Sequence, residues 1–414
     1  MMSPALSVWF GTVLIGRLFP QESGQMGFSY ADEWLRNTTR FEVSASLPLK
    51  PGLLPASPFF AGLLPEGAVR EALAHQLGLS ADNDFALLEA LGGDCAGALS
   101  LSPVGSSPEP ATAHYEPLEL DALINQAESS SLFAAKVVER ATRLSLAGAQ
   151  DKLPVAVDND GNLALPMGGA PSTHIVKVAS KSFKELPFNE VLSLRLAKAV
   201  GLRVANARLL KGQRGQVALI ERYDRRKSEG EIVRLHQEDF CQALGHPRSR
   251  KYEQEGGPSL VDAVALVRAR SREPLSDVQR LLDWQLFNLL AGNSDGHGKN
   301  LSLLHTESGI VLSPHYDLVC TRAYRTLDRN LAMSIGGARD PGQIGAQHWE
   351  AFAKQLSVGH RLVVKRVEDL SEQIPEVFEQ VAADLIEEVG DASIVNRMRM
   401  AITKQCRRTR TLLK

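Results

Sequence analysis

The sequence predicts an α+β chain of two lobes, in which a mixed strand-and-helix lobe comes first and a mostly helical lobe follows. Before Gln237 the segments that read as strands predominate, several with the apolar and polar alternation of half-buried strands. From Gln237 onward, apolar residues recur mainly at helical spacing. The 414 residues, 44% hydrophobic and 23% charged, are enough for two or three domain-sized cores.

Residues 1–104 are interpreted as an extra amino-terminal subdomain. It opens with two stretches of strand character, Val8–Phe19 and Arg40–Leu49, and the second alternates apolar with polar side chains. A helix is expected over Ala68–Leu77, because apolar residues recur there every four positions and Gly78 supplies a stop.

A connector is expected after this subdomain. Four prolines lie between Leu101 and Leu118, and the segment has no periodic apolar pattern that a core could bury. We therefore place the connector at residues 105–117. The rest of the chain then divides into 118–235, the core of the strand-rich lobe, and 236–414, the helical lobe.

The strand-rich lobe is predicted from turns and short apolar runs. Pro154–Val157 and Asn162–Leu165 flank an Asp-Asn-Asp-Gly turn and form a hairpin, and Thr173–Val178 is a further strand. A helix is expected over Asn189–Val200, and a strand over Val217–Arg225.

The distinctive chemistry follows a long helix predicted from Val278 to Leu290. The chain reads GNSDGHGKN, then two short strands around a tight turn, and then HYD. Phosphoryl transfer needs a carboxylate to orient the attacking hydroxyl and oxygen ligands to hold magnesium. Asp295 precedes Asn300 by five positions, and the hairpin returns the chain to Asp317. This order predicts Asp295 as the base, with Asn300 and Asp317 as magnesium ligands.

These residues also allow an interpretation in which they form no catalytic site. Asp, Gly and Asn after a helix are also what an ordinary loop contains, and only the order of the parts favours a site. Zinc is not favoured, since His297, His305 and His315 lack helical spacing and cysteine partners. The four cysteines lie far apart, which is typical of free thiols in a reducing compartment.

Charge and hydropathy exclude other classes of protein. The net charge of -2, from 46 basic and 48 acidic residues, gives the protein no overall electrostatic attraction to nucleic acid or to anionic membranes. The apolar stretch Ala5–Ile15 lacks the flanks of a signal peptide, and no apolar run is long enough to cross a bilayer. We therefore expect a cytoplasmic protein without a membrane partner.

The carboxyl-terminal segment is basic. Seven basic residues and no acidic one lie between Arg397 and Lys414, a composition that suits either a phosphate-binding patch or the end of a packed helix. Met398, Met400, Ile402 and Leu412 favour packing.

Several segments together resemble one known family. They are FFAGLLPEG (59–67), ALGGDCAGAL (90–99), RLSLAGAQDK (143–152), THIVKV (173–178), ALIERYDR (218–225), HQEDFCQALG (236–245) and SDGHGKN (294–300) followed by HYD. In this order they resemble the HipA family, serine/threonine kinases that act as the toxin half of bacterial toxin–antitoxin modules. The resemblance covers nearly the whole chain and implies a protein-kinase-like fold.

The resemblance implies roles for individual residues, with ATP and magnesium as cofactors. Asp295 would be the general base, and Lys177 would hold the nucleotide phosphates. We expect Glu190, on the following helix, to fix the amine of Lys177, although a solvent-facing Glu190 is equally compatible with the sequence. The full set expected to bind ATP is Ala147, Gly148, Ala149, Gln150, Asp151, Lys152, Lys177, the hinge Glu221, Arg222 and Tyr223, and Gln237, His297, Gly298, Lys299, Asn300, Tyr316 and Asp317.

The resemblance also implies regulation and partners. Ser145 corresponds to an autophosphorylation site that would act as an inactivating brake. A small helix-turn-helix antitoxin would bind the chain and associate it indirectly with operator DNA. The substrate would be a protein such as an aminoacyl-tRNA synthetase. Two alternatives stay open: an antitoxin-docking corepressor with little catalytic activity, and a kinase for a small metabolite or lipid headgroup. The sequence names neither the substrate nor the antitoxin, and it leaves the oligomeric state and the trigger open.

Overall fold

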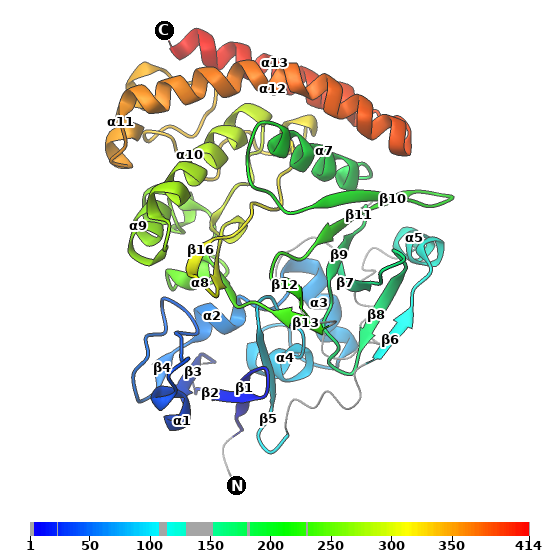
Figure 1. Cartoon of the computed structure of the whole chain (residues 1–414), viewed down its shortest axis with the longest axis vertical. Coiled ribbons are helices and arrows are strands. Elements are labelled where there is room, and N and C mark those ends of the chain that lie inside the picture. Colours follow the sequence, from blue (N-terminus) through cyan, green and yellow to red (C-terminus); the bar gives the residue numbers. More distant parts are fainter. Residues whose placement is uncertain are drawn as a thin grey trace. The chain divides into compact units, whose positions relative to one another are not determined.

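The computed structural model describes residues 4–22, 24–106, 114–129, 152–179, 183–228 and 231–413. These residues form two compact units. Unit 1 contains the described residues up to 179, with 212–215 and 219–249, and unit 2 contains 183–211, 216–218 and 250–413. Sheets dominate unit 1 and helices dominate unit 2, which confirms the α+β class (Figure 1).

The first sheet of unit 1 has five strands in the order β4-β3-β2-β1-β5. The strand character expected over Val8–Phe19 is confirmed, and the segment is a hairpin, because Gly11 takes a left-handed φ of 58° and reverses the chain. The strands are β1 (Leu6–Phe10), β2 (Val13–Pro20), β3 (Met26–Tyr30), β4 (Leu54–Pro55) and β5 (Leu99–Pro103).

The prediction of a strand over Arg40–Leu49 is wrong. Backbone N–H groups of this segment form hydrogen bonds with side chains and not with a neighbouring strand. The Tyr30 hydroxyl accepts the N–H of Val43 at 2.9 Å, and the Glu238 carboxylate accepts the N–H of Ala45 at 3.1 Å. Two polar positions of the alternation also bond to residues of unit 1, because the Ser44 hydroxyl donates to Glu238 and the Ser46 hydroxyl donates to the Gln242 carbonyl at 2.8 Å.

Helices cover the hydrophobic core of this part of unit 1, which is rich in aromatic residues such as Phe28, Trp34, Phe59 and Phe60. The predicted helix over 68–77 is confirmed as α3 (Gly67–Gln76). The other helices of unit 1 are α1 (Asp32–Arg36), α2 (Ser57–Ala61), α4 (Asp84–Leu91), α5 (Leu120–Ser129) and α8 (Phe240–Ala243).

The second sheet of unit 1 contains the predicted hairpin and the strand with Lys177. Its strands lie in the order β11-β9-β7-β8-β6. Part of the predicted connector is structured, because residues 114–117 form the edge strand β6, which ends in a proline that an edge tolerates. The strands are β6 (His114–Pro117), β7 (Lys152–Val157), β8 (Leu163–Met167), β9 (His174–Lys177) and β11 (Gln216–Glu221), whose residues 219–221 belong to unit 1.

The predicted strand Val217–Arg225 is shorter than expected. β11 ends at Glu221, and after a turn the chain enters β12 (Arg225–Ser228), which pairs with β13 (Glu231–Arg234). The short strand β14 (Gln237–Asp239) follows.

Unit 2 is built around the long predicted helix, which is α10 (Pro274–Ala291) and packs on α9, α12 and α13. The predicted helix at 189–200 begins three residues earlier, as α7 (Leu186–Ala199), because Pro187 suits a first helical turn. The other elements are β10 (Ala207–Lys211), η2 (Glu253–Glu255), α9 (Leu260–Arg270), η3 (Gly298–Asn300), β15 (Ser302–Thr306), β16 (Gly309–Leu312), η4 (Thr321–Ala323), α11 (Ala346–Gln355), α12 (His360–Val389) and α13 (Ile394–Leu413).

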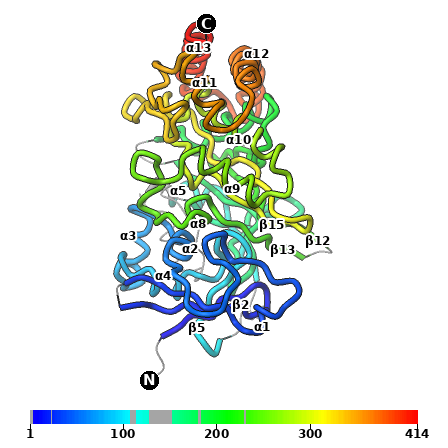
Figure 2. Tube along the Cα trace, turned by 90° about the vertical axis from the view of Figure 1, so that its left-hand side faces the viewer, coloured from blue at the N-terminus to red at the C-terminus, as the bar shows by residue number. Residues whose placement is uncertain are grey.

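The basic carboxyl-terminal segment packs as expected, except that Met400, one of the residues expected to pack, is 65% exposed. α12 and α13 lie side by side in Figures 1 and 2, and α13 buries Met398, Ile402 and Cys406. Its arginines form ion pairs, for example Arg399 with Glu379 at 2.7 Å. Packing and pairing within unit 2 thus account for much of this segment's composition.

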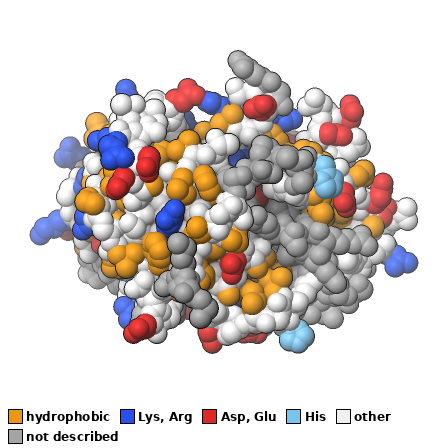
Figure 3. Space-filling model, turned by 90° about the horizontal axis from the view of Figure 1, so that it is seen from below, with side chains coloured by type: hydrophobic (Ala, Val, Ile, Leu, Met, Phe, Trp, Pro, Cys, Tyr) orange, Lys and Arg blue, Asp and Glu red, His pale blue; other side chains and the backbone are white. Residues whose placement is uncertain are grey.

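Figure 3 shows one face of the molecule, on which hydrophobic side chains gather near the middle. Among the side chains drawn in colour there, Lys and Arg lie mostly toward the left, and Asp and Glu lie both among them and toward the right.

None of the helices in the described ranges is long and apolar enough to cross a membrane.

Candidate active site

The predicted catalytic loop begins where α10 ends. Gly292 closes the helix in a left-handed conformation, with φ 77° and its N–H bonded to the carbonyl of Asn288. The Asn288 side chain accepts a hydrogen bond from the Asn293 amide at 3.0 Å, and the Asn293 side chain accepts the N–H of Asp295 at 3.0 Å. Two asparagines therefore set the path of the backbone into Asp295.

The backbone on both sides of Asp295 is also held in place. The Thr321 hydroxyl accepts the N–H of Ser294 at 2.8 Å and donates to the carbonyl of Gly292 at 3.1 Å. Gly296 has no room for a side chain, because a Cβ there would lie 2.6 Å from the Asn288 amide nitrogen. Both features give the Asp295 backbone a defined position while its carboxylate stays exposed.

Asn300 and Asp317 come together, as the sequence predicted. The Asn300 amide donates to a carboxylate oxygen of Asp317 at 3.0 Å. The Asn300 side-chain oxygen accepts the N–H of His297 at 3.3 Å, and that N–H also points to the Asp295 carbonyl at 3.0 Å. The predicted base and the two predicted metal ligands therefore belong to one connected segment of unit 2.

The predicted hairpin between these ligands is confirmed. β15 and β16 pair antiparallel, with Leu303 opposite Leu312. Tyr316 joins hairpin and loop, since its hydroxyl donates to the Lys299 carbonyl at 2.7 Å and lies 2.7 Å from the Ser302 hydroxyl. Asp317 has a φ of 58°, a left-handed conformation that costs a non-glycine residue energy and often marks functional positions.

The donor set fits magnesium. Mg²⁺ prefers hard oxygen ligands and usually takes one or two carboxylates, with water and substrate phosphates completing its coordination. Asn300 and Asp317 offer an amide and a carboxylate within one hydrogen bond of each other. Among the residues described, no group of three or more His, Cys, Asp or Glu side chains is arranged to hold a metal ion by itself.

Two predicted phosphate-binding lysines are neighbours in unit 1. β7 and β9 pair antiparallel with Lys152 directly opposite Lys177. The Lys177 side chain is buried, at 6% exposure. Glu190, its proposed partner, is buried on α7 in unit 2, so this ion pair stays a prediction.

The residues predicted to form the hinge, Glu221, Arg222 and Tyr223, have distinct environments. The Tyr223 hydroxyl donates to the Gln237 side chain, so two residues predicted to contact the nucleotide touch one another. The N–H of Arg222 donates to the Thr173 carbonyl at 3.0 Å. Glu221 is exposed.

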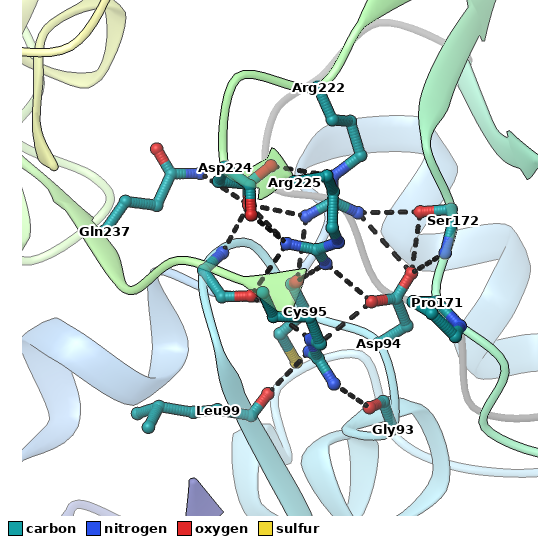
Figure 4. A network of polar contacts seen from close by, with 12 residues as sticks. Gly93, Asp94, Cys95, Leu99, Pro171, Ser172, Arg222, Asp224, Arg225 and Gln237 are labelled. Carbon is teal, nitrogen blue, oxygen red and sulfur yellow. Dashed lines mark hydrogen bonds and ion pairs between the residues drawn. The ribbon is translucent and has the colours of Figure 1, made fainter. Parts of the chain in front are cut away.

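The Arg222 side chain is buried in a network that the sequence did not predict (Figure 4). Its guanidinium donates to Asp224 at 2.8 Å and to the Ser172 hydroxyl at 2.9 Å, and Arg225 donates to Asp94 at 2.7 Å. Burial alone would raise the pKa of Asp94, but Arg225, Arg222 and Arg234 outweigh it and hold that pKa well below its ordinary range. The network thereby fixes Arg222 and Arg225 to the Gly93–Leu99 segment.

Other predicted residues lie outside the described part of the chain. These are Ser145 and the phosphate-contacting run Ala147, Gly148, Ala149, Gln150 and Asp151, whose roles stay predictions.

The sequence also did not predict the two hydrogen bonds that hold the segment just after Asp317. Asn189 on α7 accepts the N–H of Cys320 at 2.8 Å and donates to the Cys320 carbonyl at 3.0 Å. Asn189 is fully buried, and a buried amide needs partners, but its burial is not evident from the sequence.

The loop, the hairpin and the paired oxygen ligands define a phosphotransferase-like site on a two-unit α+β chain. The HipA N-terminal domain family matches residues 6–102, and the HipA-like C-terminal domain family matches residues 144–385. The chain belongs to the HipA family.

Individual relatives agree with this assignment. The chain is 40% identical to "Putative kinase Y4mE" of Sinorhizobium fredii, over 94% of this chain and 95% of that protein. It is 33% identical to the "Serine/threonine-protein kinase toxin HipA" of Shewanella oneidensis, over 97% and 95% respectively. A solved structure of the Shewanella HipA, HipB and operator DNA complex matches with a TM-score of 0.85 and 32% identity, over 98% of both chains.

Proposed function

We propose that this chain is an ATP-dependent serine/threonine protein kinase that acts as the toxin of a toxin–antitoxin module. One observation carries the proposal: the hydrogen bond between Asn300 and Asp317 places two oxygen-bearing side chains together beside the loop that presents Asp295. The name of the Shewanella relative supports the activity and the toxin role.

Each proposed catalytic residue has a defined task. The exposed carboxylate of Asp295 orients the substrate hydroxyl and accepts its proton. Asn300 and Asp317 hold Mg²⁺, which when bound neutralises phosphate charge. Lys299, next to Asn300, contributes positive charge, and His297 and Gly298 shape the loop.

In unit 1 we assign the ATP phosphates to two groups of residues. One is the neighbouring pair Lys152 and Lys177, and the other is the run from Ala147 to Asp151. We assign adenine recognition to the hinge Glu221–Tyr223 together with Gln237, which Tyr223 contacts.

The proposed partners follow from the relatives. The solved Shewanella complex contains HipB and operator DNA, and it supports a small antitoxin partner and an indirect association with DNA. A translation component such as an aminoacyl-tRNA synthetase is the protein substrate that we propose from the family resemblance. We place this activity in the cytoplasm.

Incubation of the purified chain with magnesium, ATP labelled at the γ-phosphate and a bacterial extract tests the proposal. Transfer of label to one protein band is expected. A small labelled product would favour the metabolite or lipid kinase, and no turnover would favour the corepressor.

Expression of the chain without a partner is expected to arrest growth, and Asp295→Ala is expected to relieve the arrest. The reason is that arrest requires phosphorylation of the substrate and not mere presence of the protein. Growth curves at matched protein levels, verified by immunoblot, measure the effect. Normal growth at high levels of active wild-type enzyme would contradict the toxin role.

Phosphorylation of Ser145 is expected to weaken ATP binding. A phosphoserine carries about -1.5 to -2 charges near neutral pH, and here it would lie two residues before the run proposed to contact the ATP phosphates. Mass spectrometry after incubation with magnesium and ATP locates the modification, and titration with a nucleotide analogue measures affinity. Equal affinity of modified and unmodified protein would refute the brake.

A further inference from the structure

Tyr252 contacts the proposed catalytic base directly. Its hydroxyl donates a hydrogen bond to the Oδ1 atom of Asp295 at 2.6 Å, a length typical of a hydroxyl bound to a charged carboxylate. The two residues are 43 positions apart in sequence and lie in the same unit. We infer that Tyr252 is a positioning residue that holds one oxygen of Asp295 and leaves the other for the substrate hydroxyl. This inference rests on the proposed function.

Tyr252 and its neighbour hold the catalytic loop at more than one point. The Lys251 carbonyl accepts the N–H of Gly298 at 3.2 Å. The Tyr252 ring packs edge-on against His297, with ring centroids 5.1 Å apart and an interplanar angle of 83°. The hydroxyl contact with Asp295 is therefore one of three contacts along the loop, which restricts how far Tyr252 can move from it.

Tyr252 itself is fixed by a tight turn. Its carbonyl accepts the N–H groups of Glu255 at 3.0 Å and Gly257 at 2.9 Å. Gly256 takes a left-handed φ of 80°, and a Cβ on Gly257 would lie 2.4 Å from the Arg250 carbonyl oxygen. The two consecutive glycines therefore let the chain close behind Tyr252.

The turn is anchored on its other side as well. The Glu253 carboxylate accepts the Ser334 hydroxyl at 2.7 Å and the Ser334 N–H at 2.5 Å. Tyr252 thus lies between this anchor and the catalytic loop. Such support is what a side chain needs if it is to fix the orientation of a catalytic group.

The two carboxylate oxygens of Asp295 differ. Oδ1 carries the Tyr252 bond, whereas Oδ2 has no hydrogen-bond partner within the described ranges, and the residue is exposed. In the proposed reaction the substrate hydroxyl gives its proton to Oδ2 as its oxygen bonds to the γ-phosphorus. The bond from that phosphorus to the β–γ bridging oxygen breaks, and its electron pair leaves with ADP. Tyr252 keeps its own proton throughout.

Tyr252→Phe in the full-length chain tests the inference, because phenylalanine keeps the ring against His297 and removes only the hydroxyl. The expected result is a kcat for protein phosphorylation about 10-fold lower, the order of one hydrogen bond to a charged group. The KM for ATP and the thermal unfolding midpoint should match wild type. Tyr115→Phe is the matched control, since it removes a hydroxyl that donates to the Pro171 carbonyl in unit 1.

A double-mutant cycle separates positioning from general structural damage. In an Asp295→Ala background, Tyr252→Phe should change the residual rate by less than about 2-fold, because the group that it positions is gone. An equal 10-fold loss in both backgrounds would overturn the inference. An unchanged rate in the Tyr252→Phe variant would also overturn the inference. A faster rate would overturn it as well, because it would show that the hydroxyl hinders the reaction. A wild-type chain that transferred no phosphate would overturn the proposed function and this inference together.

Discussion

Asp295→Ala is expected to lower phosphoryl transfer to protein by about 10²- to 10⁴-fold, the usual contribution of a general base. The loss should be confined to the chemical step. Asp295 is exposed, and the bond from Tyr252 is the only hydrogen bond of its side chain within the described ranges, so its removal should leave the fold intact. Initial rates of label transfer from ATP measure the effect.

Asp295→Asn is the matched variant, because it keeps the size of the side chain and removes the charged acceptor. It should be as slow as the alanine variant, while titration with a nucleotide analogue should give wild-type affinity for both. Wild-type turnover in either variant would show that another residue is the base.

Asp94→Ala is expected to have the largest effect on stability. Asp94 is 1% exposed and forms ion pairs with Arg225 at 2.7 Å and Arg222 at 3.5 Å (Figure 4). Without Asp94, the buried guanidinium groups of Arg222 and Arg225 must share the Asp224 carboxylate, and breaking a buried ion pair typically costs about 3–5 kcal/mol of unfolding free energy. Urea unfolding at pH 7 measures the loss.

The exposed pair Arg195–Glu388 provides the control. The side chain of Glu388 is 50% exposed, so Glu388→Ala should cost at most about 1 kcal/mol. Equal costs for Asp94→Ala and Glu388→Ala would contradict the importance assigned to the buried network.

The same network should make the protein sensitive to acid. Burial alone would raise the pKa of Asp224, but Arg222 and Arg225 outweigh it and lower that pKa to about 2, from an ordinary value of 3.8. A carboxylate with a lowered pKa contributes stability above its unfolded value and loses that contribution as the pH falls through its folded value. The contribution of Asp224 should therefore disappear between about pH 4 and pH 2, whereas that of Asp94, whose pKa is lowered further, should persist to more acidic pH.

The contact between Asn300 and Asp317 in the proposed catalytic loop could be predicted from sequence because the parts of this loop are local. Asp295, Asn300 and Asp317 fall within a span of 22 positions that includes a hairpin with clear turn residues. Spacing along the chain then determines which side chains meet. The structure brings Asn300 and Asp317 into contact as the motif order predicts.

Contacts between distant segments could not be read from the sequence in this way. Asp94 and Arg225 are 131 positions apart, and nothing in the local pattern around either residue indicates the other. The same applies to Tyr252, an aromatic residue in a polar segment whose partner lies beyond two intervening helices. The alternation at 40–49 misled for a related reason, because remote side chains such as Glu238 satisfy its backbone.

The most direct test of the kinase assignment is transfer of a γ-phosphate label from ATP to serine or threonine residues by the purified chain. Asp317→Asn belongs in the same assay, because it keeps the side-chain size and removes the charged magnesium ligand. The proposal predicts labelled phosphoserine or phosphothreonine from wild type with magnesium, and strong loss of label with a chelator or in Asp317→Asn. No label from wild type with magnesium, or undiminished label in the variant, would contradict it.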